Sequence, residues 1–206
     1  MGTWAAIFIK TNDLESVTNK LQKLSNIDTV IRDVFPTKDL YENMLLDDDT
    51  KPTYLVFAQT QPSWIMIRHN GFKNLEKWGE DLSEFFKTKI IIACAQTNAG
   101  FYHFSLYDKG EMQRKIECCY GSDYEPINIG NRFEFEDEQP GSKEEYDGET
   151  EYIFDFDNIE EYSRHFGLEI QPNYDDKKEW LILKSSVNQN TLKNFYNKPK
   201  AWWKFW

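Results

Sequence analysis

Residues 89–120 read KIIIACAQTNAGFYHFSLYDKGEMQRKIECCY, which is three strand-like runs separated by two short turns. Asn98-Ala99-Gly100 separates the first run from the second, and Asp108-Lys109-Gly110 separates the second from the third. Turns this short join neighbouring antiparallel strands, whereas parallel strands need a long crossover. The stretch therefore predicts an antiparallel meander with strands at 89–95, 101–107 and 112–120.

The region before the meander alternates apolar runs with two amphipathic segments. Residues 13–24 and 75–86 repeat apolar side chains at helical spacing, so each predicts a helix with one apolar face. Asn12, with Glu15 three residues on, is expected to cap the first helix. Strands are expected at 3–10, 29–35, 53–60 and 64–69, and a loop with one helical turn at 37–51.

The region after Tyr120 is dominated by glycine, proline, asparagine and acidic residues. Aromatic and acidic residues alternate at 132–136 and at 151–157, which predicts strands with one apolar and one acidic face. A helix is expected at 157–166 with Gly167 as its C-cap, and a strand at 180–184. The whole order predicts an α+β fold, a mixed or antiparallel sheet with two or three covering helices.

The length of 206 residues fits one large domain or one domain with an appendage. We expect an α+β core at 2–120, an acidic, aromatic-rich segment at 121–184 that completes the same domain, and a basic aromatic tail at 185–206. Aromatic residues make up 16% of the chain, so it can build a core that a disordered chain lacks.

The negative charge is concentrated in residues 123–161. This segment holds 15 of the 35 acidic residues and two bases, a net of −13, while the rest holds 20 acids and 22 bases, a net of +2. A local charge excess creates a local field that selects partners of opposite charge. It predicts a basic protein partner, and the pI near 4.8 argues against nucleic acid.

The expected localisation is cytoplasmic. Every apolar run is shorter than the roughly 18 residues that a membrane-spanning helix needs. The run at 4–9 is too short for a signal peptide, and the three cysteines lack the spacing of a disulfide framework. Residues 200–206 read KAWWKFW, which suits either a membrane interface or packing against the body. We favour packing, so membrane binding is not expected.

Motifs for cofactors and catalysis are missing. The sequence has no glycine-rich nucleotide motif, no zinc spacing and no EF-hand loop, so neither a cofactor nor a metal is expected. Cys94 and His103 are expected on neighbouring strands, as a catalytic Cys–His pair requires. Cys94 lies among Ile92, Ala93 and Ala95, which favours a buried core thiol. No catalytic residue is therefore predicted.

Residues 64–110 resemble a pattern found in uncharacterised bacterial proteins. A strand begins at Trp64, a helix contains EDLSEFF at 80–86, and KTKIII follows at 87–92. YHFSLY at 102–107 then precedes the turn at 109–111. The resemblance covers about a quarter of the chain. It implies a bacterial origin and no particular activity.

The predicted binding face combines carboxylates and aromatic side chains of the acidic segment. Its residues are Glu134, Glu136, Asp155, Asp157, Phe133, Phe135, Phe154 and Phe156. Spaced carboxylates over an aromatic floor suit a basic protein partner, because opposite charges speed association. A soluble edge hairpin, charged to block edge-to-edge pairing, explains the same pattern equally well.

The leading hypothesis is a non-enzymatic, immunity-like protein-binding module whose acidic face occupies a basic partner. The analogy with immunity proteins rests on surface character alone. Two alternatives remain open: a hydrolase that uses pocket carboxylates such as Asp33 or Asp155, and membrane-surface attachment through residues 201–206. A deep pocket holding carboxylates of raised pKa would favour the hydrolase.

Overall fold

The computed structural model describes residues 3–25, 27–34, 54–61, 63–69, 75–121, 123–170 and 180–184. The large sheet contains β1 (Thr3–Ile9), β2 (Thr29–Val34), β3 (Tyr54–Gln61), β4 (Trp64–His69), β5 (Lys89–Gln96), β6 (Phe101–Asp108), β7 (Glu111–Cys119), β8 (Ile127–Gly130) and β11 (Trp180–Lys184). A separate hairpin contains β9 (Ser142–Tyr146) and β10 (Glu149–Ile153). The helices are α1 (Leu14–Ser25), α3 (Leu75–Phe86) and α4 (Phe156–His165), with a short 3-10 turn, η1 (Thr97–Ala99).

The fold is α+β, as predicted. Within the described residues, nine strands pair in the order β2-β11-β3-β4-β1-β5-β6-β7-β8, and every pairing is antiparallel. The predicted meander is confirmed as β5-β6-β7, and the predicted hairpin at 53–69 is confirmed as β3-β4. β8 and β11, both from the region after Tyr120, extend the same sheet.

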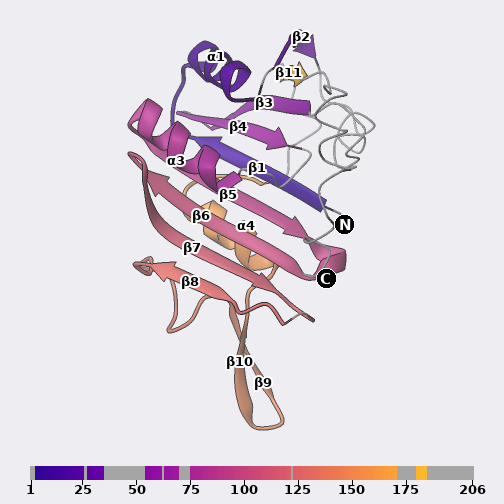
Figure 1. Cartoon of the computed structure of the whole chain (residues 1–206). Helices are drawn as coiled ribbons and strands as arrows, with labels where there is room; N and C mark the ends of the chain where they lie inside the picture. The colour runs from indigo at the N-terminus through magenta and orange to yellow at the C-terminus, as the bar shows by residue number, and fades with distance from the viewer. Residues whose placement is uncertain are drawn as a thin grey trace.

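The two faces of the sheet carry different helices (Figure 1). Successive side chains of a strand point to opposite faces, so β1 sends Ile7 and Ile9 to one side and Phe8 to the other. α1 and α3 cover the side of Ile7, here called the α3 face. α4 covers the side of Phe8, here called the α4 face. A sheet buried on both sides explains why β1 and β5 are apolar almost throughout.

The cap of α1 lies one residue later than predicted. The backbone N–H of Ser16 donates to Asp13 Oδ1 at 2.9 Å, so Asp13 and not Asn12 supplies the capping side chain. Asn12 Oδ1 instead accepts from the backbone N–H of Ser63 at 2.8 Å. Asn12 therefore ties the start of α1 to the β3–β4 turn.

The α4 helix begins at a capping box that was not predicted from the sequence and ends before a glycine. Asp155 accepts from the backbone N–H of Asn158, and the Asn158 side chain accepts from the backbone N–H of Asp155, which forms a capping box. At the other end, Leu168 N–H donates to Ser163 and Gly167 N–H donates to Arg164. Gly167 has a φ of 74°, which glycine adopts at little cost. The predicted helix is confirmed with its bounds one residue earlier, at Phe156–His165, and its C-cap is Phe166, with Gly167 the residue after the cap.

The acidic segment departs most from expectation. Residues 132–136 were expected to form a strand, but they form a turn outside the large sheet. β10 ends at Ile153, so only the start of the second alternating run is a strand. The β8 strand was not predicted. The loop expected at 37–51 and the tail at 185–206 lie outside the described residues.

Candidate functional site

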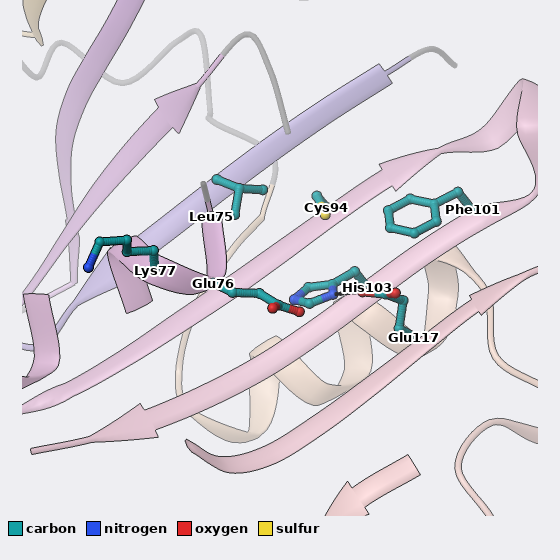
Figure 2. Close-up of a pocket in the computed structure, with 7 residues that line it drawn as sticks. All are labelled: Leu75, Glu76, Lys77, Cys94, Phe101, His103 and Glu117. Carbon is teal, nitrogen blue, oxygen red and sulfur yellow. Dashed lines mark hydrogen bonds and ion pairs between the residues drawn. The ribbon is translucent and has the colours of Figure 1, made fainter. Parts of the chain in front are cut away.

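A pocket of about 370 Å³ lies on the α3 face, where the first turn of α3 meets β5, β6 and β7 (Figure 2). Its lining residues are Leu75, Glu76, Lys77, Cys94, Phe101, His103 and Glu117. The register of the meander brings them together, since Cys94 lies opposite His103 and His103 lies opposite Glu117. The predicted adjacency of Cys94 and His103 is therefore confirmed.

His103 is the centre of a hydrogen-bond chain across two strands. Its Nδ1 lies 2.7 Å from Glu117 Oε2, and its Nε2 lies 2.9 Å from Ser105 Oγ. An ionised carboxylate can only accept, so Nδ1 carries the proton. His103 and Ser105 are buried, and the side chain of Glu117 is 13% exposed. Both ring nitrogens of His103 are thus occupied within the protein.

Glu117 is held in its ionised form. Burial raises the pKa of this carboxyl, but hydrogen bonds from His103 and Tyr124 and the charges of His103 and Lys115 outweigh burial and lower the pKa to about 2. Lys115 Nζ lies 3.4 Å from Glu117 Oε2 and also pairs with Glu76 on α3. A lowered pKa is the opposite of what a general acid requires.

The order Ser105–His103–Glu117 has the hydrogen-bond pattern of a catalytic triad. Ser105, however, is 0% exposed, and it lies within a regular strand under α3. A nucleophile must reach a substrate atom, and this hydroxyl is covered. This series of hydrogen bonds therefore holds the His103 ring in the sheet, and it does not present a serine nucleophile.

Cys94 and Cys118 are core thiols of this sheet. Cys94 is buried, and burial together with the nearby charge of Glu117 raises the pKa of its thiol well above the usual range. Burial likewise raises the pKa of Cys118 to about 11. A reactive cysteine needs the opposite shift, because the thiolate is the nucleophile. The expectation of a buried Cys94 is confirmed.

Glu136, one of the predicted binding carboxylates, lies inside the protein. Arg114 donates to it through Nε at 2.9 Å and Nη2 at 2.6 Å, and both side chains are 0% exposed. Glu136 Oε1 also accepts from the backbone N–H of Phe133 at 3.1 Å. The prediction that Glu136 faces a partner is wrong, because Arg114 of β7 already neutralises it.

The other three predicted carboxylates occupy different environments. Asp155 caps α4 through hydrogen bonds to the backbone of Asp157 and Asn158. Glu134 and Asp157 are exposed. The four residues therefore do not form one acidic strand face, since one is buried, one is a helix cap and two face solvent.

The predicted aromatic residues belong to the core on the α4 face. Phe154 is buried, and Phe133, Phe135 and Phe156 are partly buried and pack against the same cluster. Tyr162 of α4 contacts Phe133, Phe135 and Phe154 edge-on, with ring centroids 5.1 to 6.1 Å apart. The aromatic floor expected beneath the acidic residues is thus the contact between α4 and the sheet.

The exposed acidic residues gather instead on the β9–β10 hairpin, which the predicted site did not include. Five of the segment's exposed acids lie on this hairpin: Glu144, Glu145, Asp147, Glu149 and Glu151. The connecting residues Asp147 and Gly148 have φ values of 50° and 83°, the left-handed conformations of a tight hairpin turn. An Asp-Gly pair between two strand-like runs is the sequence signal that identifies such a hairpin.

Within the described residues, no three His, Cys, Asp or Glu side chains are grouped so that they could hold a metal ion. None of the helices described has the length and apolar character to cross a bilayer.

Comparison of the chain with protein-family models, with curated proteins and with solved structures found no match. Function has to be inferred from the geometry of this chain alone.

Proposed function

We propose that the chain is a non-enzymatic, immunity-like module that binds a basic protein through the β9–β10 hairpin. The observation that carries this proposal is the register of the hairpin, in which Glu144 lies directly opposite Glu151. Like charges directly opposite each other destabilise a strand pair. A lysine or arginine of a partner, placed between these carboxylates, would relieve the repulsion on binding.

The position of the hairpin supports the same proposal. β9 and β10 pair with each other and with no described strand of the large sheet, and they extend beyond β8 (Figure 1). Their one base, Lys143, lies 3.6 Å from Glu145 and leaves the other carboxylates in excess. Such a field speeds association with a basic protein by roughly 10- to 1,000-fold and weakens with salt.

The hydrolase alternative is less well supported. The pocket on the α3 face does contain carboxylates, but the pKa of Glu117 is lowered and not raised. Asp155 acts as the cap of α4. These roles favour binding over carboxylate catalysis.

The test compares capture of partners from a bacterial host lysate by the wild-type chain and by the triple variant Glu144→Lys, Glu149→Lys, Glu151→Lys. We expect a basic protein to be enriched by the wild type and lost with the variant. Calorimetry with that purified protein should then show affinity that falls as salt increases.

A matched control reverses three exposed acids elsewhere, Glu80→Lys, Glu84→Lys and Glu111→Lys. It changes the net charge equally and should retain the partner. Equal capture by wild type and hairpin variant, or equal loss with both variants, would contradict a role for the hairpin.

A further inference from the structure

The pocket on the α3 face is separate from the hairpin and is not used by the proposed function. Its volume of about 370 Å³ falls in the range of small-molecule sites. Four elements line it, α3, β5, β6 and β7: Leu75 and Glu76 come from the first turn of α3, and Phe101 comes from the start of β6. Figure 2 shows Cys94 and His103 between them.

Among the described residues that line the pocket and their ion-pair partners, carboxylates outnumber cations by one, counting histidine as neutral. Glu76 and Glu117 are the two carboxylates, and Lys115 pairs with both of them. Lys77 also borders the pocket, but its ammonium pairs with Asp81 at 3.0 Å. Two carboxylates against one lysine make the pocket attractive to a monocation.

Of the described carboxylates and ring nitrogens in the pocket, Glu76 is the group that keeps an acceptor for a ligand. The oxygens of Glu117 accept from Tyr124 and from His103, and both His103 nitrogens are occupied. Glu76 is 56% exposed and uses Oε1 for Lys115. Its second oxygen can accept a further hydrogen bond, while Leu75 and Phe101 provide apolar walls.

We propose that this pocket binds a small organic monocation, a primary ammonium on an aromatic stem. The ammonium donates to Glu76, and the stem lies over Cys94 and against Leu75 and Phe101. A charge-assisted hydrogen bond fixes one end of the ligand, and ring contact with Phe101 fixes the other. An anion is repelled by Glu76, and a neutral analogue loses the charge-assisted bond.

The test titrates the full chain with 2-phenylethylammonium, with neutral 2-phenylethanol and with anionic phenylacetate, followed by backbone amide NMR. We expect saturable shifts at 75–77, 94, 101 and 103 with the ammonium, and affinity about tenfold weaker for the alcohol. Glu76→Gln should weaken ammonium binding by about tenfold, because it removes the charge but keeps the shape.

The control Glu80→Gln makes the same change one turn further along the same helix, outside the pocket lining, and should leave binding unchanged. The hairpin triple variant should also bind the ammonium normally. The pocket can therefore be confirmed even if the hairpin is found to bind no basic protein. Equal binding of all three compounds, no binding of the ammonium, or no effect of Glu76→Gln would overturn the proposal.

Discussion

Arg114 shows how a single residue settles the role of the acidic segment. Its guanidinium holds Glu136 in a bidentate pair and also donates through Nη1 to Asn128 Oδ1 at 2.6 Å and to the carbonyl of Ile129 at 2.9 Å. Both partners of the ion pair are 0% exposed. A charge this deeply buried is tolerated only when it is paired and hydrogen-bonded. Arg114 therefore fastens the 133–136 turn to β7 and β8.

Arg114→Met should destabilise the fold by about 3–5 kcal/mol, because it leaves the Glu136 carboxylate buried without its counter-charge. Arg114→Met combined with Glu136→Met should cost clearly less than the sum of the two single changes. Denaturant unfolding of the four proteins measures both quantities. A strictly additive double variant would show that the pair is not coupled.

Glu117 should contribute a pH-dependent part of the stability. Its folded pKa of about 2 lies below the usual value of 4.5, so the folded state binds fewer protons than the unfolded state between these values. The contribution is present in full above the unfolded pKa and is lost as the pH falls through about 4.5 toward 2. The stability difference between wild type and Glu117→Gln should shrink over this window.

Unfolding free energies at pH 7, pH 4.5 and pH 3 would measure the Glu117 effect. Glu111→Gln, an exposed change on the same strand, is the control for general acid effects. A difference between wild type and Glu117→Gln that stays constant with pH would contradict the assigned role.

The contact between His103 and Glu117 could not be read from the sequence. The turn at 108–111 would by itself place His103 opposite Ile116, but a bulge between Leu106 and Tyr107 shifts the register by one residue and brings Glu117 opposite. One residue of shift also exchanges the faces of the strand. Cys94 and His103 were expected only on neighbouring strands, and the β5–β6 register, which continues without a bulge, places them directly opposite each other.

Elements with a strong period were predicted well, because periodicity reports one buried face directly. α3 is confirmed over Leu75–Phe86, and the meander strands are confirmed within a residue or two. The run at 132–136 has the same alternation as a strand, yet it is a turn. Phe133 and Phe135 pack against the core cluster that contains residues of α4, and Glu136 is buried by its pair with Arg114. These partners lie elsewhere in the sequence, so the local alternation wrongly predicted a strand.

α3 packs so closely on β6 that one position cannot carry a side chain. A Cβ added at Gly79 would lie 2.4 Å from Cε2 of Tyr107. Overpacking costs about 1–3 kcal/mol, whereas alanine gains up to about 1 kcal/mol over glycine inside a helix. The clash is the larger effect, so Gly79→Ala should lower the unfolding free energy by about 1–2 kcal/mol.

Repeating Gly79→Ala in a Tyr107→Leu background tests the cause of that loss. Removing the ring should make the alanine neutral or stabilising, and thermal unfolding of the four proteins gives the coupling. If Gly79→Ala lowers the unfolding free energy equally in the Tyr107→Leu background, the Tyr107 ring is not the cause of the loss.

At the scale of the whole molecule, β11, a strand from near the end of the described chain, lies between β2 and β3 and joins β2 to the sheet. β2 pairs with β11 and with no other described strand, and β11 in turn pairs with β3. The sequence predicted both strands but not their adjacency, since nothing local links residues 29–34 to 180–184. Such long-range pairing must overcome a large loop-closure entropy.

Ile182→Pro should therefore detach β2 as well as β11. Proline removes a ladder hydrogen bond in a strand that is paired on both sides, a position that proline does not tolerate in a sheet. Hydrogen exchange should show amides 29–34 losing protection while amides of β5–β7 keep theirs, because that meander is paired independently of β11. Ile182→Val is the matched control: it keeps the backbone hydrogen bonds, costs about 0.5–1.5 kcal/mol and should leave 29–34 protected. Protection of β2 that survives Ile182→Pro would mean that β11 is not what holds β2 to the sheet.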